Sequence, residues 1–561
     1  MFSEVLGGPV RYVHFLELAI TYGDLLSRRG SLVRLHPGLV CSAPPGMCDD
    51  LTAALMIHRK ESRVGGIGVS GTGKALKAAL VVLVALLSGI IIYGAVVFNR
   101  PELMSPGPYH PRALVAQLKG YRVHPWVKID PTKQYTLKIW STRWPMFRDG
   151  YGYDDLVEEV IDEFQAGYRN VDVEYVLLPL DEVGKAIAEA VENATPPNIC
   201  IAPFDPSLID SGLVVPIDMF ICDEPRDDIK ATPATDFELS SLQAVSAGNR
   251  LWAWPSWISV KSWAGNAAIL REAGIDVERV MLYGWSYKDI LTMIETLRAR
   301  EAGVPEQYMT YGLVLDTTAT HVLDTLMEAA GRGLVLSEDG DLMWQGEAIR
   351  SSLSFLQDVK AIKGFPEPVH MMTERMLELF WTGRAAVIGP VGPGFLRHVR
   401  ERQDRITAGG VFSGKETVEP VLLPVPHPTG GMSSRGIAVH AAAVFTYPGT
   451  GGEDTAYLAV RLAEALARKE ALWLAGELPV VPARTKDRQH GFDLATRPDG
   501  ASRRFLLGAA SSGRMYRNLS PEMKEKERLL REQVISPMMN QFWRGALGPD
   551  EFERRLHDAE R

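Results

Sequence analysis

The fold is decided by the stretch from residue 135 to residue 202, which reads YTLKIWSTRWPMFRDGYGYDDLVEEVIDEFQAGYRNVDVEYVLLPLDEVGKAIAEAVENATPPNICIA. Its first segment, Tyr135–Ser141, is rich in β-branched and aromatic residues and predicts a strand. Asp154 can cap the helix that follows, because apolar residues then recur at helical spacing as far as Gly167, which is placed to end it.

The same alternation then repeats along the chain. Val171–Leu178 predicts a second strand, Glu182–Ala190 a second helix and Asn198–Ala202 a short buried strand. This order of strands and helices is typical of a parallel sheet with helices on its faces. We therefore expect an α/β fold.

Further along, helical patterns predominate, with short strands among them. Ser286 and Asp289 have the spacing of a capping box. Ser337–Asp341 predicts a tight turn and Ala385–Ile388 a buried strand. Further helices are predicted at Met371–Phe380, Thr455–Leu474, Met523–Gln541 and Pro549–His557.

Upstream of the sheet, Ala78–Phe98 contains no charged residue. A helix of about 21 residues spans a hydrocarbon core of about 30 Å. The basic residues before it are Arg59, Lys60, Arg63, Lys74 and Lys77. The positive-inside rule then predicts a single-pass signal-anchor in the cell membrane, with everything after Asn99 extracytoplasmic, at the cell surface or in the periplasm. A cleaved signal peptide is the alternative.

Two further segments flank this helix. Residues 99–133 are rich in proline, which favours an extended stalk. Residues 1–77 would be cytoplasmic, and their GxGxxG and GxxxxGK patterns precede a membrane helix rather than an amphipathic one, so a glycine-rich linker explains them. A start at Met56 would leave a short basic region before the anchor, so we suspect that residues 1–55 are not translated.

Composition excludes several classes of function. The 60 Lys and Arg residues against 69 Asp and Glu give a net charge of −9, which repels phosphate backbones and argues against nucleic-acid binding. The four cysteines, at 41, 48, 200 and 222, form no CxxC pair, so neither a disulfide scaffold nor a zinc site is expected. HExxH, GxSxG and metal-spaced histidines are also lacking, so we expect no enzyme, catalytic residue, metal or cofactor.

Tryptophan placement is the positive signal. Six of the 12 tryptophans fall in two short runs, which are Trp140 and Trp144, then Trp252, Trp254, Trp257 and Trp263. Both runs lie at the ends of predicted strands, where open α/β sheets have their ligand crevices. Aromatic faces can stack on sugar rings while polar groups bind the hydroxyls. One tryptophan alone would more simply fill core, but the two runs together favour a pocket.

Several longer segments support this interpretation in order along the chain. They are Ile199–Ile217 (ICIAPFDPSLIDSGLVVPI), Asn249–Asp276 (NRLWAWPSWISVKSWAGNAAILREAGID), Phe380–Phe395 (FWTGRAAVIGPVGPGF), Met432–Ala443 and Gly476–Arg484 (GELPVVPAR). With these segments, the chain from about Gln134 onward resembles the extracellular solute-binding proteins of the maltose-binding, family 1 type, which serve ABC importers.

The resemblance implies a two-lobed, periplasmic-binding-protein-like fold at residues 134–561, with a hinge between the lobes. Lobe one would comprise about 134–248 and 436–486, and lobe two about 249–435 and 487–561. By position, the implied ligand contacts are Trp140, Arg143, Trp144, Asp205, Trp257, Phe395, Ser434 and Arg435. Arg435 could equally form a hinge salt bridge.

The expected function is therefore a membrane-anchored receptor that captures a sugar or oligosaccharide by lobe closure and delivers it to the permease subunits of an ABC importer. It would act as a monomer. A surface sensor that reuses the fold for a non-sugar ligand is the alternative. Cys200 and Cys222 would both be exported, so they could form a disulfide, or Cys200 could be a buried thiol.

Overall fold

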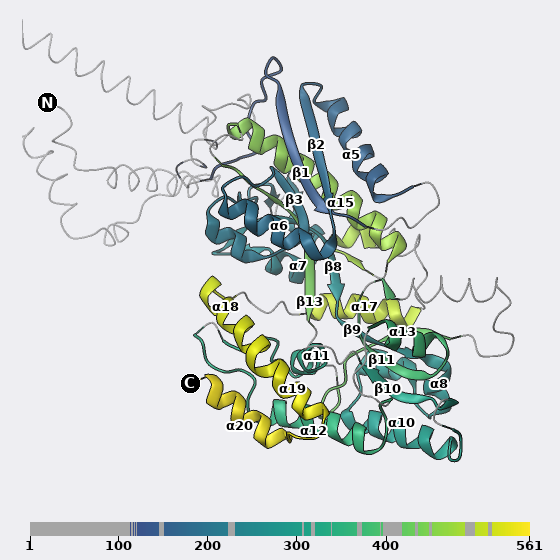
Figure 1. Cartoon of the computed structure of the whole chain (residues 1–561). Coiled ribbons are helices and arrows are strands. Elements are labelled where there is room, and N and C mark those ends of the chain that lie inside the picture. Colours follow the sequence, from purple (N-terminus) through teal and green to yellow (C-terminus); the bar gives the residue numbers. More distant parts are fainter. Residues whose placement is uncertain are drawn as a thin grey trace, which may run out of the picture. The chain divides into compact units, whose positions relative to one another are not determined.

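The predicted alternation of strands and helices builds the first sheet of the computed structural model (Figure 1). The elements in order are β1 (Tyr135–Thr142), α5 (Tyr153–Gly167), β2 (Val171–Leu178), α6 (Leu180–Glu192) and β3 (Ile199–Pro203). β1 pairs in parallel with both β2 and β3, as the sequence pattern predicts. The cap of α5 differs, because Gly152 is its N-cap and donates its backbone N–H to the Asp155 carboxylate at 2.5 Å.

The structure describes Ala113, Ala116, Leu118 and residues 121–560 with gaps. The gaps are 145–150, 223–230, 306–307, 316–319, 338, 367–372, 393, 396–417, 432–435, 448–450, 479, 489–499 and 514–518. The chain divides into units at Met1–Val115 and Ala116–Arg561. Residues 1–77 and the predicted membrane segment Ala78–Phe98 lie outside the described residues, and none of the described helices is long and apolar enough to cross a membrane.

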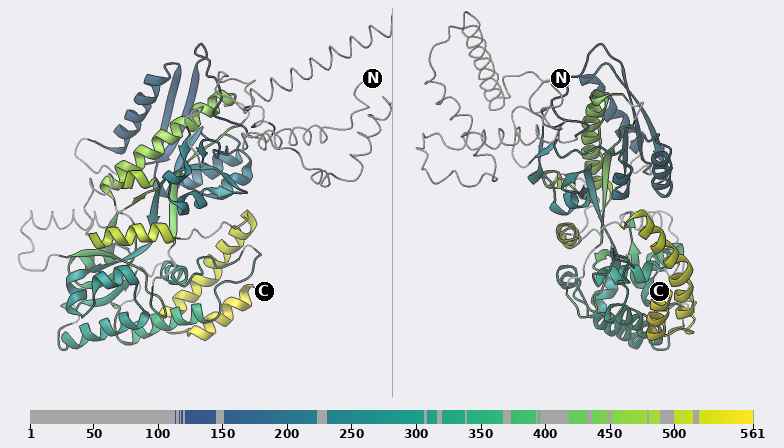
Figure 2. Two further views of the ribbon diagram at one scale, coloured as in Figure 1. Left: turned by 180° about the vertical axis from the view of Figure 1, so that it is seen from behind. Right: turned by 90° about the vertical axis from the view of Figure 1, so that its left-hand side faces the viewer.

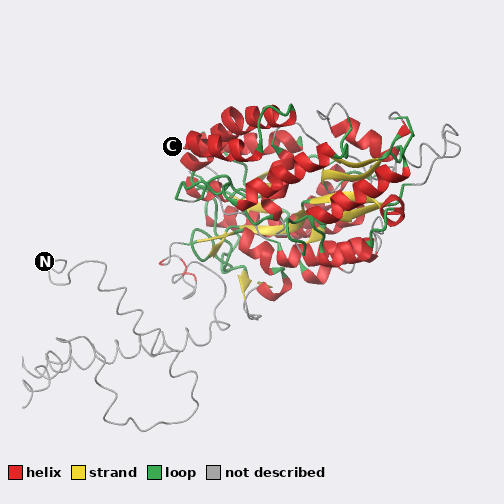
Figure 3. Cartoon of the chain, turned by 90° about the horizontal axis from the view of Figure 1, so that it is seen from below, coloured by secondary structure: helices red, strands yellow, loops and turns green. Residues whose placement is uncertain are grey.

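The first sheet is completed by strands from later in the chain. β8 (Ala253–Val260), β13 (Ile437–Val444) and β14 (Val481–Pro482) join it, giving the order β14-β8-β13-β3-β1-β2. Because side chains alternate between faces along a strand, Ile199 and Ile201 of β3 pack with α5 and α15 (Glu453–Glu477). Cys200 and Ala202 pack on the opposite face with α6 and α7 (Leu239–Ala244). Seen from below, the strands run between red helices (Figure 3).

The second lobe has its own sheet of four strands, in the order β10-β11-β9-β12. The strands are β9 (Ser262–Asn266), β10 (Tyr311–Leu315), β11 (Ala385–Val391) and β12 (Pro420–Leu423). The helices are α8 (Ala267–Glu272), α9 (Val277–Tyr283), α10 (Tyr287–Arg300), α11 (His321–Ala329), α12 (Glu347–Ala361) and α13 (Thr373–Trp381). The predicted capping box is present, with the Ser286 backbone N–H donating to the Asp289 carboxylate at 2.7 Å and the Asp289 N–H to the Ser286 hydroxyl at 3.1 Å.

The C-terminal part of the chain forms a helical layer on the second lobe (Figure 2, yellow). The predicted helix Met523–Gln541 is present as α18 (Pro521–Leu530), a π-helical turn η7 (Arg531–Ile535) and α19 (Ser536–Trp543), followed by α20 (Pro549–Glu560). Helix α17 (Gly500–Ser512) contacts β8 of lobe one and β12 of lobe two.

Two expected boundaries differ from the structure. The first crossing to lobe two begins after Val260 rather than at residue 249, because β8 is an interior strand of lobe one, paired with β13 on one side and β14 on the other. The expected stalk ends before residue 133, because Val123 and Trp126 are buried and Val123 packs in the lobe one core. The neighbouring Tyr121 hydroxyl also donates to Asp218.

Cys200 and Cys222 do not form the disulfide that the sequence left open. Cys200 is a free, buried thiol. Cys200 lies in β3 and Cys222 in the short strand β4 (Ile221–Cys222). Burial raises the pKa of the Cys200 thiol far above its usual value, as expected for an inert core side chain.

Candidate functional site

The candidate site begins where the parallel strands of lobe one end. Trp140 of β1 lies opposite Cys200 of β3, so the two strands end at the same edge of the sheet. The chain leaves β1 into a loop that carries Arg143 and Trp144, and it leaves β3 toward Asp205. Open α/β sheets bind ligands at this edge. Trp140, Arg143, Trp144 and Asp205, all implied by the resemblance, therefore lie near or just after the ends of these two strands.

Trp144 contacts Trp257, which belongs to the second run of tryptophans. The Trp144 and Trp257 ring centroids lie 5.6 Å apart in an edge arrangement, and His440 of β13 stacks on Trp257 at 3.8 Å with an interplanar angle of 16°. Trp257 is only 1 % exposed, whereas Trp144 is half-buried. In this conformation Trp144 is the member of the cluster that reaches the surface, and a ligand could touch Trp257 only if its neighbours moved.

The other tryptophans of the two runs are not gathered with this pair. Trp140 is half-buried against the largest apolar cluster. The Trp254 indole donates to the backbone oxygen of Val460 at 3.0 Å, beneath α15. Trp252 donates to Ala247 at 2.9 Å, and Trp263 is fully buried in the sheet of lobe two. Of the two runs, the structure brings Trp144 and Trp257 into ring contact, and a pocket at these residues stays a prediction.

A buried carboxyl group lies beneath the Trp144–Trp257 pair. Glu470 of α15 accepts hydrogen bonds from the Ser256 hydroxyl at 2.8 Å, the Tyr153 hydroxyl at 3.1 Å and the Trp144 indole at 3.4 Å. Burial raises the pKa of Glu470 to about 7, against the lowering effect of these donors. Glu470 was not among the residues expected from the sequence. One signal was available, because Glu470 occupies the apolar stripe of its helix, four residues from both Leu466 and Leu474.

His440 is the second buried titratable group in this cluster. Burial lowers its pKa to about 3, so the imidazole is neutral at ordinary pH. A neutral, flat ring can stack on Trp257 without bringing a charge into the core.

Asp205, expected to contact the ligand, contacts the other lobe in this structure. Its carboxylate caps the short helix η3 (Pro206–Ser211) by accepting from the Ser207 N–H at 2.9 Å, and it pairs with the Lys524 ammonium of α18 at 2.7 Å. Burial works to raise the pKa of Asp205, but Lys524 and Ser207 hold it below its usual value. Asp205 thus links lobe one to the C-terminal helices of lobe two.

The remaining expected ligand contacts are Phe395, Arg143, Ser434 and Arg435. Phe395 is 6 % exposed and packs edge-on against Phe380 at 5.3 Å in the core of lobe two. Arg143 is exposed at the end of β1, and its backbone N–H donates to Leu178 at 2.6 Å. Ser434 and Arg435 lie outside the described residues.

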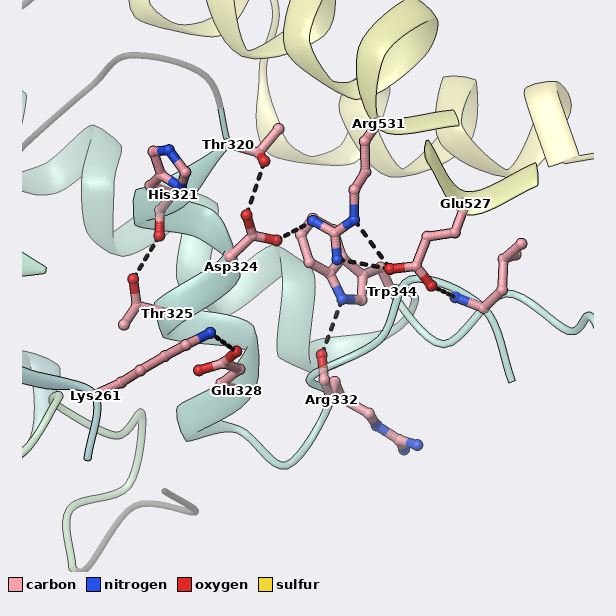
Figure 4. Close-up of polar contacts among 11 residues, drawn as sticks. Lys261, Thr320, His321, Asp324, Thr325, Glu328, Arg332, Trp344, Glu527 and Arg531 are labelled. Atoms are coloured by element: carbon pink, nitrogen blue, oxygen red, sulfur yellow. Dashed lines mark hydrogen bonds and ion pairs between the residues drawn. The ribbon is translucent and has the colours of Figure 1, made fainter. Parts of the chain in front are cut away.

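A charged network follows the hinge (Figure 4). Lys261, the residue between β8 and β9, pairs with Glu328 of α11. Its backbone N–H also donates to Gly436 at 3.2 Å, where the chain returns to lobe one. A Cβ atom at Gly436 would lie 2.5 Å from the Glu328 carboxylate, so any larger residue there would displace this carboxylate. Glu328 is therefore packed between the outgoing and returning chain.

The network continues into the C-terminal helices (Figure 4). The Arg531 guanidinium contacts Asp324 of α11 and pairs with Glu527 at 2.8 Å, with Trp344 beneath it at 5.1 Å from the ring centroid. Glu527 also accepts the Leu336 backbone N–H at 3.3 Å. Through these contacts α18, which carries Lys524, is bound to α11. Helix α11 also carries Glu328, the partner of Lys261.

The described residues offer no group of three or more His, Cys, Asp or Glu side chains that could hold a metal ion. The arrangement therefore consists of an aromatic and polar face on lobe one, a hinge, and an ion pair between the lobes.

No protein-family model matches the sequence, and no curated protein matches it. Solved structures do. The GacH receptor of Streptomyces glaucescens, solved unliganded and with acarbose, matches 76% of this chain and 97% of its own, with a TM-score of 0.54 at 17% identity. The maltotriose-binding protein of Thermus thermophilus matches 76% and 98% with a TM-score of 0.51 at 16% identity. The sugar-binding protein MalE of Xanthomonas citri matches 76% and 96% with a TM-score of 0.54 at 16% identity.

These likenesses confirm the predicted two-lobed fold. The neighbours include maltose-binding and ABC solute-binding proteins, the group that the sequence segments resemble. The chain has the fold of the maltose-binding type of solute-binding protein.

Proposed function

We propose that this protein is an extracytoplasmic receptor that captures a carbohydrate between its lobes and delivers it to an ABC importer, held at the membrane by Ala78–Phe98. The observation that carries the proposal is the extent of the fold match, which spans 97% of a receptor solved with acarbose. The protein is not an enzyme in this proposal, and binding followed by lobe closure is its whole activity.

The binding face of lobe one supports a sugar as the ligand. Trp144 lies half-buried at the strand ends and can stack on a sugar ring, while Arg143 and Asp205 offer a donor and an acceptor for hydroxyl groups. Lobe two closes over this face by rotation at Lys261 and Gly436, where the chain passes between the sheets.

A sensor for a non-sugar ligand is the second candidate, and one observation favours it. Trp257 and Phe395 are buried, so fewer of the expected sugar contacts reach the surface than the sequence suggested, and the exposed Asp205 already has a charged partner in Lys524. A receptor for a charged ligand would need less aromatic surface.

Titration of the purified full chain with maltotriose and acarbose, followed by tryptophan fluorescence, tests the proposal. We expect saturable quenching that is reduced in Trp144→Ala. The control is Trp252→Ala, because Trp252 belongs to a small hairpin away from the Trp144–Trp257 pair. A response to a polyamine or an amino acid but to none of a wide panel of sugars would favour the sensor.

The membrane and transport parts need separate measurements. We expect the chain to sediment with membranes and its C-terminal unit to be cleaved by protease added to intact cells. Crosslinking to a permease, with transport lost on deletion of this gene, would support delivery. Membrane association without any transport defect would support sensing.

A further inference from the structure

The buried carboxyl group beneath the binding face has an unusual set of partners. The described donors to Glu470 are two hydroxyl groups and indole groups, all of them uncharged. They come from the loop after β1, from α5 and from β8, so Glu470 joins three separate elements of lobe one to α15. A carboxyl group that is fully buried without a cationic partner costs stability, and such groups cluster at functional sites.

The Trp144 bond is the one that reaches the binding face. At 3.4 Å from its nitrogen to the carboxyl oxygen it is long, so its strength depends on the charge of the acceptor. The Tyr153 hydroxyl is also close to Ser141 at 2.7 Å. The Ser256 hydroxyl shares its one hydrogen between the Ala467 carbonyl oxygen at 2.7 Å and Glu470 at 2.8 Å, so both hydroxyl groups are anchored beside the carboxyl group. The rest of the cluster is thus fixed, and Trp144 is its surface-facing member.

We propose that Glu470 is a positioning residue for the ligand: its carboxylate orients the Trp144 indole on the binding face and makes ligand affinity rise with pH. The proposal rests on the proposed function, because it assumes that Trp144 contacts the ligand. Protonation removes the negative charge that the Trp144 N–H faces, so the ring is held less firmly in the acid form.

No other group of the cluster titrates in the same range. Tyr153 is the titratable group that faces Glu470 from α5, and burial raises its pKa well above its usual value. From β13, His440 lies behind Trp257 with a pKa of about 3. Among the described contacts from β8, the polar partner is Ser256, which does not titrate near neutrality. Glu470, with a pKa of about 7, is therefore the group of this cluster that changes charge between pH 6 and pH 8.

The test is the affinity of the full chain for maltotriose and acarbose across pH 6 to 8, in the wild type and in Glu470→Gln. We expect wild-type affinity to rise severalfold with pH and the Glu470→Gln affinity to stay near the low-pH wild-type value at every pH. Glu464→Gln is the matched control, since this carboxylate of the same helix contacts Thr232 at 2.6 Å and Arg461 at 3.2 Å instead of an indole. A Glu470→Gln chain that keeps the wild-type pH profile overturns the proposal.

A second readout needs no ligand. Tryptophan fluorescence of the free wild-type chain should titrate with a midpoint near neutrality. The transition should vanish in Glu470→Gln and should become clearly smaller in Trp144→Phe, where Trp257 is left to report it. Tyr153→Phe should move the midpoint to higher pH, because Tyr153 stabilises the charged carboxylate. If the transition keeps its full amplitude in Trp144→Phe, the positioning role is wrong. If the transition behaves as expected but no sugar binds at any pH, the proposed function fails instead.

Discussion

Two polar networks in this molecule are built in opposite ways. In lobe one, Glu470 is buried among hydroxyl, indole and apolar groups. Along the hinge and the C-terminal helices lie three separate groups of ion pairs, which are Lys261 with Glu328, Arg531 with Asp324 and Glu527, and Lys524 with Asp205. The first network uses uncharged donors inside one lobe, and the second uses paired charges at the chain crossing, within lobe two and between the lobes.

The difference follows from what each network has to do. A buried carboxyl group with fixed donors holds one geometry and responds to pH, because its ionisation is opposed by burial. In the second network the Lys524–Asp205 pair is partly exposed, and such pairs are weak and screened by salt, so this contact between the lobes can be broken at low cost. We therefore interpret the first network as shaping the binding face and the second as setting the balance between lobe positions.

The largest expected effect is on the core beneath the binding face. Trp257→Ala should lower the free energy of unfolding by about 3–5 kcal/mol, because it removes a fully buried indole and leaves a cavity. Chemical denaturation measures this loss, and Trp252→Ala, at a half-buried ring, should cost clearly less. A near-neutral Trp257→Ala would mean that its ring is available to the ligand, as the sequence analysis expected.

The second prediction separates the two buried titratable groups of lobe one. The pKa of Glu470 is about 7 in the folded state and about 4.5 in the unfolded state. As pH falls from 7 to 4.5, the folded state takes up the proton first, so the contribution of Glu470 to stability rises. The pKa of His440 is about 3 in the folded state and about 6.5 in the unfolded state. As pH falls from 6.5 to 3, the unfolded state takes up the proton first, so the contribution of His440 to stability falls. Between pH 6.5 and 4.5 the two effects cancel.

Removing either group should reveal the other. At about 1.4 kcal/mol per pH unit, Glu470→Gln should lose roughly 3 kcal/mol of stability relative to the wild type on going from pH 6.5 to 4.5. His440→Gln should gain a similar amount over the same interval. Urea denaturation at several pH values measures both slopes. Parallel slopes in the two variants would show that neither group carries the shifted pKa.

The sequence predicted the framework of lobe one well, because β1, α5, β2 and β3 have periodic patterns that local rules can interpret. It predicted less of the site, because a site depends on which side chains meet across the chain. Trp257 was expected to face the ligand, but both faces of its strand β8 are buried and the Trp257 side chain is 1 % exposed. Asp205 follows a strand end as expected, yet its partner Lys524 comes from a helix more than 300 residues away, which no local pattern could indicate.

The third prediction addresses the hinge network. Arg531→Met should destabilise the chain by roughly 2 kcal/mol, because Asp324 and the buried Glu527 would lose the charge that balances them. Arg528→Met is the control. Its partners Glu525 and Glu532 are exposed, so the free energy of unfolding should hardly change. Equal losses in the two variants would show that burial of the Arg531 cluster does not matter.

The smallest expected effect is at the ion pair between Lys524 and Asp205. Both side chains are partly exposed, so Lys524→Gln should change stability by less than about 1 kcal/mol. Its effect should instead appear in lobe position, because this pair connects the lobes directly. Small-angle scattering of the full chain should show a larger radius of gyration in Lys524→Gln at low salt, and the difference should shrink as salt is raised and the wild-type pair is screened. Lys526→Gln, an exposed lysine on the same helix, is the matched control. If Lys524→Gln and Lys526→Gln scatter alike at every salt concentration, the pair does not hold the lobes together, and closure depends on the hinge and the ligand alone.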